Sequence, residues 1–283
     1  MPLLLFRSLW TNGFDLDAAL ADVSSGLFDG IEGPVPDNSP ERVSFIERIA
    51  SEGIPYIAEV TTGGGYVPFD RSAAAQLEDL RRKLDIAAPT NPQFVTCLAG
   101  CDAWSPTTSI DFLGQALEIA RQRGLTVAFE THRSRSTFNP WVTATILRQV
   151  PALRLTCDFS HWCCVCERLV LNEEPGLVAL FARHALHVHA RVGYAQGPQV
   201  PDPAAPEYAT ELQSHERWWE ILASARPANA PFTMTPEFGP DGYLQTAPYT
   251  KAPAANLDDV NRWMARRLRE RFGAALAIAE RAR

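Results

Sequence analysis

Four short apolar segments between residues 125 and 237 each end in a side chain that can bind a metal ion. These side chains are Glu130, Asp158, His189 and Glu237. Three carboxylates and one imidazole suit a hard or borderline divalent cation such as Mn²⁺, Mg²⁺, Co²⁺ or Zn²⁺. Without a cation, converging carboxylates repel one another and raise each other's pKa values. One carboxylate at a strand end is often only a helix cap or an ion-pair partner, but four such residues together indicate a metal site.

These segments belong to a repeating pattern of short apolar runs and longer amphipathic runs, which is typical of β-α units. The runs are apolar without strict alternation, as in parallel strands that are covered on both faces. We therefore predict an α/β fold, a (β/α)8 TIM barrel formed by residues 1–283 as a single domain, whose strand ends meet at one mouth. The alternative is an open doubly wound sheet, but no glycine fingerprint follows the first strand. The expected strands are Leu3–Trp10, Phe28–Glu32, Pro55–Val60, Phe94–Ala99, Leu125–Glu130, Leu153–Asp158, Leu186–His189 and Phe232–Glu237.

Two further segments are predicted from the same pattern. Gly63, Gly64 and Gly65 follow the third strand, and we interpret them as a flexible loop over the barrel mouth. A long helix is expected to close the chain over Leu257–Arg281.

The residues around the four strand ends resemble the xylose-isomerase-like TIM-barrel superfamily, which includes sugar phosphate isomerases and epimerases and the abasic-site endonucleases. The resemblance implies that the four residues bind one metal ion, commonly Mn²⁺, that the two glutamates transfer protons, and that His161 contacts the substrate. The matching motifs are Phe129-Glu130-Thr131-His132, Asp158-Phe159-Ser160-His161-Trp162, His187-Val188-His189-Ala190-Arg191 and Pro236-Glu237-Phe238-Gly239.

The chemistry of sugar isomerisation fits these residue types. Isomerising or epimerising a sugar next to its carbonyl requires removal of a C–H proton, and a divalent ion acidifies that proton and stabilises the enediolate. A carboxylate on each face can then remove and return the proton, and Glu130 and Glu237 are the candidates. Alternatively, both are pure ligands and His161 carries the proton. The predicted activity is that of a metal-dependent isomerase or epimerase of a sugar, a sugar phosphate or a related polyol or keto compound.

Several polar and aromatic side chains near the strand ends are candidates for substrate contact. Arginine forks suit carboxylate or phosphate groups, whereas rim arginines commonly pair with loop acids instead. Tryptophan rings stack on sugars or simply pack under loops. His187 lies two residues before His189 and is a candidate core histidine. The candidates for substrate contact are His132, Arg133, Arg191, Trp104, Trp162 and Gln199.

Two positions depart from the ketose epimerases of the superfamily. Those enzymes often carry a second glutamate where this chain has Ser136, and an arginine where it has Ala195. The substrate is therefore open, and a metal-dependent dehydratase of an inosose-type substrate is an alternative activity.

Two candidate functions belong to different classes of protein. An abasic-site endonuclease needs further histidines on the second and third strands and an Asp-x-His pair after the seventh. Here no histidine precedes His132, and Asp202 is followed by proline and alanine. The second candidate is a non-catalytic carbohydrate-binding barrel, although binding alone does not need a charged metal cage.

The composition narrows the possible partners and compartments. The net charge of -7 argues against binding to nucleic acid. No apolar run approaches the roughly 18 residues of a membrane span, and the N-terminus lacks the features of a signal peptide. Four of the six cysteines lie within ten residues, so we expect reduced thiols and a cytoplasmic protein.

Two clusters can each be interpreted in two ways. Cys163 and Cys166 form a C-x-x-C pair, which is either a zinc or redox site or a group of buried thiols. Relatives in the superfamily often form homodimers or homotetramers, and Trp218 and Trp219 either belong to such an interface or pack on the barrel.

Overall fold

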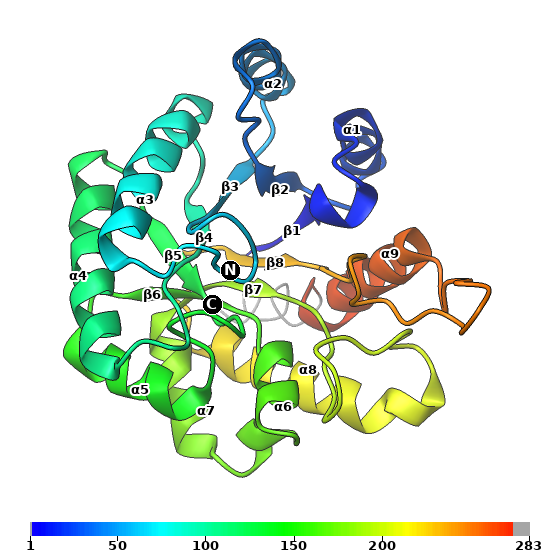
Figure 1. Cartoon of the computed structure of the whole chain (residues 1–283). Coiled ribbons are helices and arrows are strands. Elements are labelled where there is room, and N and C mark those ends of the chain that lie inside the picture. The colour runs from blue at the N-terminus through cyan, green and yellow to red at the C-terminus, as the bar shows by residue number, and fades with distance from the viewer. Residues whose placement is uncertain (1, 274–283) are drawn as a thin grey trace.

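Eight parallel strands form a closed barrel in the computed structural model, which describes residues 2–273 (Figure 1). Each strand pairs with the next one along the chain, and β8 closes onto β1. This architecture confirms the predicted (β/α)8 TIM barrel. The strands are β1 (Leu3–Ser8), β2 (Gly30–Pro34), β3 (Tyr56–Thr61), β4 (Val95–Leu98), β5 (Val127–Glu130), β6 (Arg154–Cys157), β7 (Ala185–His189) and β8 (Phe232–Thr235).

The helices surround the barrel (Figure 1). Most of them begin where the sequence supplies a cap or a proline: Ser72 and Ser105 accept hydrogen bonds from the first turns of α3 and α4, and proline occupies the start of α4, α5 and α7. The helices are α1 (Leu16–Ser24), α2 (Ser39–Glu52), α3 (Ala73–Ala87), α4 (Pro106–Gln122), α5 (Pro140–Gln149), α6 (Ser160–Val165), α7 (Pro175–His184), α8 (Ala209–Ser224) and α9 (Leu257–Leu268).

Helix α9 differs from the prediction at its end. The expected helix ran from Leu257 to Arg281, but α9 ends at Leu268 and continues only as a π-helical turn over Arg269–Gly273. Residues 274–281 of the expected helix lie outside the described residues.

The interior of the barrel changes from apolar to polar along the strands. His187 packs against Phe6 and Phe94, with ring centroids 6.1 and 5.4 Å apart. Residues two apart on a strand point to the same side, so His189 follows His187 and Glu59 follows Ile57 toward the mouth. The apolar layer beneath them consists of Phe6, Ile57 and Phe94. The fold therefore places a polar layer directly on an apolar floor.

The described residues also answer three smaller questions. Trp218 and Trp219 are buried, so both pack on the barrel rather than forming an exposed patch. All six cysteines are free. In the part of the chain that the structure describes, no helix is both long and apolar enough to cross a bilayer.

Candidate metal centre

The four residues expected to bind a metal ion converge at the mouth of the barrel. One ligand atom from each of Glu130, Asp158, His189 and Glu237 lies within 4.8 Å of the others, and all four side chains are buried. His189 Nδ1 lies 3.0 Å from a carboxylate oxygen of Glu237 and 3.6 Å from one of Glu130. Glu130 and Glu237 also line a void of about 10 Å³, which is the size of a single water molecule. The space suits one ion.

Two atoms of this cluster make no hydrogen bond to any described residue although both are buried. They are His189 Nδ1 and Glu237 Oε2. Buried polar atoms are normally paired, because an unpaired one costs about 1 to 3 kcal/mol. A nitrogen lone pair and a carboxylate oxygen that face each other without a shared hydrogen bond are a natural pair of ligands for a cation between them. The donor set therefore fits a divalent ion.

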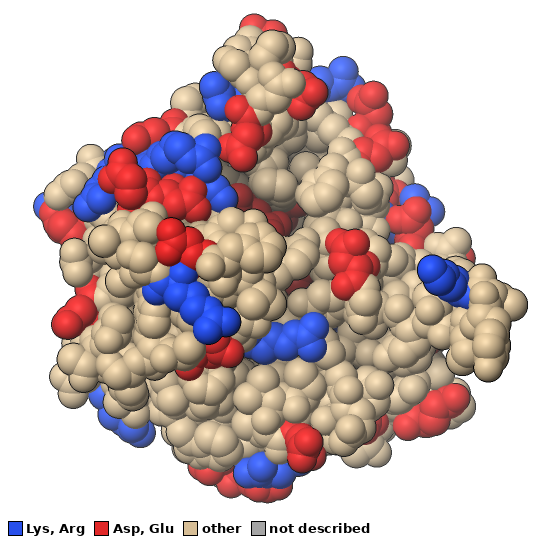
Figure 2. Space-filling model, viewed as in Figure 1, with Lys and Arg blue, Asp and Glu red and all other residues tan. Residues whose placement is uncertain are grey.

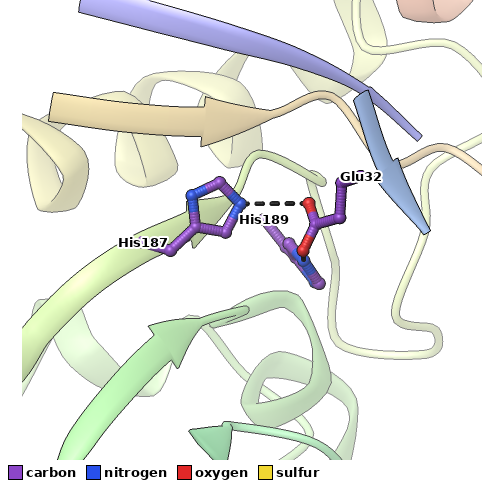
Figure 3. Close-up of side chains that lie close together, drawn as sticks. All are labelled: Glu32, His187 and His189. Atoms are coloured by element: carbon purple, nitrogen blue, oxygen red, sulfur yellow. Dashed lines mark hydrogen bonds and ion pairs between the residues drawn. The ribbon is translucent and has the colours of Figure 1, made fainter. Parts of the chain in front are cut away.

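Glu32, in β2, orients the metal-facing histidine. Its two carboxylate oxygens accept hydrogen bonds from His189 Nε2 and His187 Nε2, each at 3.1 Å (Figure 3). Metal-binding histidines usually donate their second ring N–H to a carboxylate in this way, which fixes the tautomer and the ring plane. Because Nε2 of His189 carries the proton toward Glu32, Nδ1 is the atom that faces the cluster.

The charges around Glu32 explain why its carboxylate stays ionised although it is buried. Burial raises the pKa of Glu32, but the charges and hydrogen bonds of His189 and His187 outweigh this and hold it well below the ordinary range. Burial lowers the pKa of His187, whereas the carboxylates of Glu237, Glu32 and Glu130 outweigh burial and hold the pKa of His189 well above normal. In the absence of an ion, His189 is therefore protonated more readily than His187.

Arg191 supplies the permanent positive charge of the cluster. Its guanidinium contacts Asp158, lies 3.4 Å from Glu237 and donates to His161 Nε2 at 2.9 Å. Burial raises the pKa of Asp158, which the guanidinium of Arg191 partly counteracts. The guanidinium is buried and paired with these groups, and it also lines the void beside Glu130 and Glu237, so Arg191 stays a candidate for substrate contact.

The glutamate and histidine candidates for proton transfer differ in their electrostatics. Burial raises the pKa of Glu130 to about 7. The carboxylates of Glu237 and Asp158 raise this pKa further, whereas His189 lowers it. Burial and the neighbouring His132 and Arg191 hold the pKa of His161 well below its ordinary value. His161 is therefore a neutral imidazole that accepts a hydrogen bond from Arg191.

Comparison with known proteins places this site in a family. A family model described as a xylose isomerase-like TIM barrel matches residues 21–199, which is more than half of the chain. The chain belongs to this family. No curated protein sequence matches the chain. The matched range includes the strand ends at Glu130, Asp158 and His189.

Solved structures resemble this member of the family in fold. Endonuclease IV from Thermus thermophilus superposes with a TM-score of 0.60 at 14% identity, over 96% of this chain and 100% of that one. A xylose isomerase-like TIM barrel protein from Mycobacterium smegmatis in complex with magnesium gives 0.59 at 14% identity, over 95% and 97%. A sugar phosphate isomerase/epimerase from Parabacteroides distasonis gives 0.59 at 8% identity, over 95% and 98%. At these identities the likeness establishes the fold alone.

In this family member, His132 and Arg133 are at the mouth. The His132 and His161 rings are in contact, with their centroids 3.9 Å apart, and His132 Nε2 lies 3.3 Å from the hydroxyl of Tyr243. The guanidinium of Arg133 covers the ring of Tyr243 at 5.0 Å and is only partly buried. His132 lines the void and Arg133 lies over a residue that lines it, so both stay candidates for substrate contact.

Three other residues predicted to contact a substrate are engaged elsewhere. Trp162 is fully buried and donates to the carbonyl of Thr137. Trp104 packs on Phe112 and donates to the carbonyl of Arg71. The side-chain amide of Gln199 makes two hydrogen bonds to the backbone of Gly239. The contacts of Trp162 and Gln199 correct the prediction, because both side chains are fully buried within the fold, whereas Trp104 is partly exposed and its substrate contact stays a prediction.

The glycine loop and Ser136 are also more constrained than expected. Arg135 is buried and donates to the carbonyls of Thr62 and Gly65, so it anchors the glycine loop to the barrel. Ser136 is buried against Gly100, where an added Cβ would collide with the serine hydroxyl. A glutamate at position 136 would therefore clash inside the protein instead of entering the mouth.

The sequence analysis missed several residues that line the cavity. Trp10, Tyr66, Tyr243 and Glu59 line the void beside Glu130 and Glu237. A second cavity of about 240 Å³ adjoins it and shares Trp10, Glu59 and Tyr66. Figure 2 shows this face of the molecule: Asp and Glu atoms lie at the bottom of a hollow near its centre, with Lys and Arg atoms beside it. Through their shared residues, the larger cavity adjoins the void beside Glu130 and Glu237.

Proposed function

We propose that this protein is a divalent-metal-dependent isomerase or epimerase that moves a proton next to the carbonyl of a sugar or a related polyol or keto compound. The observation that carries the proposal is the convergence of four buried ligand atoms within 4.8 Å of one another, with His189 Nδ1 facing the carboxylates without a hydrogen bond and its Nε2 held by Glu32. A neighbour in fold is described as a sugar phosphate isomerase/epimerase, and another as a complex with magnesium. Mn²⁺ is the first ion to test, and Mg²⁺, Co²⁺ and Zn²⁺ suit the same ligands.

The side chains around the site divide the work of the reaction. A divalent ion, when bound, polarises the substrate carbonyl and its neighbouring hydroxyl. Glu130 and Glu237 are the proposed pair that removes and returns the carbon-bound proton, because both carboxylates line the void. His161, held by Arg191 at 2.9 Å, is the proposed contact to a substrate oxygen. The aromatic side chains that line the void exclude water from this chemistry.

The proposal favours small molecules over nucleic acid as substrates. Abasic-site endonucleases of this superfamily use additional histidines, and β2 and β3 of this chain present Glu32 and Glu59 instead. The carboxylate of Glu59 lines the cavity and, once ionised, repels a phosphodiester backbone, whereas Glu32 is buried against two histidines. The cavity next to the void, at about 240 Å³, suits a molecule smaller than a typical drug.

The first experiment measures the metal. Protein purified without chelators or metal-affinity resin is analysed by mass spectrometry, as wild type and as His189→Ala and Glu130→Ala. The control is Glu118→Ala, a surface change on α4. We expect about one ion per chain in the wild type and the control, and a loss of that ion in both site variants. If both site variants keep the metal content of the wild type, these residues do not hold the ion and the proposal is refuted.

The second experiment tests the reaction itself. The metal-loaded protein is incubated in D₂O with a panel of aldoses, ketoses and keto polyols, and the products are followed by proton NMR. Proton transfer next to a carbonyl exchanges that hydrogen for deuterium even when the equilibrium hides net conversion. Loss of water from the substrate would instead identify a dehydratase. Metal binding without exchange or dehydration on any member of the panel would favour a carbohydrate-binding barrel.

A further inference from the structure

Glu59 is a carboxylate in the cavity that the proposed reaction does not use. It is the fourth residue of β3, paired in register with Pro34 of β2 and Thr96 of β4. Ile57, two residues earlier, belongs to the apolar floor of the barrel, so the alternation of the strand directs Glu59 into the polar layer above it. The side chain is partly exposed, and it lines both the ion-sized void and the adjoining cavity.

Two other acids of this layer are already paired, and Glu59 is not. Glu32 is bonded to two histidines, and Asp158 is paired with Arg191. Within residues 2–273, no side-chain hydrogen bond or ion pair engages the Glu59 carboxylate. It also stands outside the group of four residues that could hold the ion. Its free oxygens therefore face the cavity, where only a ligand or water can satisfy them.

The walls of the cavity indicate what kind of ligand group meets Glu59. Trp10 and Tyr66 flank it in an edge-to-face pair with ring centroids 5.9 Å apart. The nearby cation, Lys83, also lines this cavity, but its ammonium is already engaged, since it donates to the carbonyl of Thr61 and lies 3.7 Å from Asp79. Aromatic faces pack on the C–H groups of a sugar, and a carboxylate accepts hydrogen bonds from its hydroxyls. A phosphate or carboxylate in the same place would meet a like charge once Glu59 is ionised.

The ionisation of Glu59 depends on what occupies the neighbouring site. In the ion-free protein, burial and the carboxylates of Glu237, Glu32 and Glu130 raise the pKa of Glu59 to about 8. A divalent cation bound among those carboxylates would offset part of their repulsion and so favour the ionised form of Glu59. Neutral and phosphorylated ligands are therefore to be compared on the metal-loaded protein.

We infer that Glu59 is a specificity-determining residue that binds the hydroxyl groups of an uncharged sugar or polyol and disfavours phosphorylated substrates. This inference rests on the proposed function and names its substrate class. The side of the barrel formed by β1 to β3 would then contact the hydroxylated end of the substrate. The side formed by β5 to β8 would hold the reacting end.

The test compares matched sugars by calorimetry on the Mn²⁺-loaded protein. The probes are fructose, xylulose and ribulose, each beside its terminal phosphate ester. We expect the wild type to bind the neutral member of a pair at least tenfold more tightly. In Glu59→Gln, which keeps the shape and loses the charge, neutral binding falls at least tenfold and the preference within a pair shrinks. Glu78→Gln, an exposed carboxylate of α3 paired with Arg81, is the matched control and leaves both values unchanged.

Metal content by mass spectrometry accompanies each titration and separates the failures. Equal metal in the wild type and Glu59→Gln, with equal sugar binding in both, would overturn the inference while leaving the proposed function intact. Tighter binding of the phosphate esters than of the neutral sugars would overturn it as well. So would a metal-loaded wild type that binds none of the neutral sugars. Loss of the ion in Glu59→Gln would reassign the residue to the metal. A wild type without metal would instead reject the proposed function.

Discussion

The hydrogen bond from His189 to Glu32 gives a quantitative prediction for metal affinity. Glu32→Gln keeps the size of the side chain and removes its charge. One oxygen remains to accept from His189 Nε2, and His187 can adapt because its other nitrogen, 2.9 Å from the hydroxyl of Thr233, can donate to that hydroxyl after a change of tautomer. The variant therefore loses the charge assistance but not the contact.

Removing the acceptor altogether has a larger effect. In Glu32→Ala, the Nε2–H of His189 is left buried without an acceptor, and the ring loses the contact that aims Nδ1 at the carboxylates. Changes to such outer partners of a metal ligand usually cost tenfold to a hundredfold in metal affinity, or about 1.4 to 2.7 kcal/mol. We assign the lower end of this range to Glu32→Gln and the upper end to Glu32→Ala.

The assay is a competition for Mn²⁺ between the protein and a fluorescent chelator of known affinity. Circular dichroism of each variant reports whether the barrel is intact. Glu118→Gln on the surface of α4 is the control and should match the wild type. If both Glu32 variants fold and bind Mn²⁺ within twofold of the wild type, the reasoning that Glu32 orients His189 is refuted.

Two further predictions concern protons. The surrounding carboxylates raise the pKa of His189, and burial raises the pKa of Glu130 to about 7, so a divalent ion should release about one to two protons when it binds at pH 7. The affinity for the ion should therefore rise with pH. Calorimetry in buffers of different ionisation enthalpy counts the released protons, and a count of zero would contradict the prediction. Burial lowers the pKa of His215 to about 4. As the pH falls below about 6.5, this histidine takes up a proton in the unfolded chain but not in the folded chain. The free energy of unfolding should therefore decrease by up to about 3 kcal/mol near pH 4. Denaturant titrations should show this loss in the wild type and a smaller one in His215→Gln, and equal losses would contradict it.

The sequence was sufficient to predict the barrel and the four converging residues because both depend on position along strands. In a (β/α)8 barrel the carboxyl end of every strand lies at the same mouth, so Glu130 and Asp158 could be placed together without knowing any loop. Glu32 and Glu59 carried a similar signal. Each is a carboxylate within an apolar strand, and such a residue in a barrel covered by helices must face the polar interior.

The residues that the sequence analysis placed wrongly depend on contacts that no periodicity encodes. Trp162 lies one residue after His161 on α6, and one step around a helix separates the mouth from the core. Tyr66 is brought over the cavity because Arg135, far along the chain, binds the carbonyls of its loop. Aromatic residues in loops therefore cannot be assigned to a cavity or to the core before the tertiary contacts are known.

The charge around the candidate metal centre links the ion to the protons that replace it. The buried charged side chains of the centre and of its direct contacts are Glu32, Glu130, Asp158, Glu237 and Arg191. With every acid ionised, these four negative charges and one positive charge leave three negative charges in a buried space. A proton on His189 and one on Glu130 would reduce this to one negative charge, and a divalent ion in their place would do the same. Proton and metal thus compete for one electrostatic role, so protons on His189 and Glu130 reduce the repulsion in the metal-free site and must leave when an ion binds.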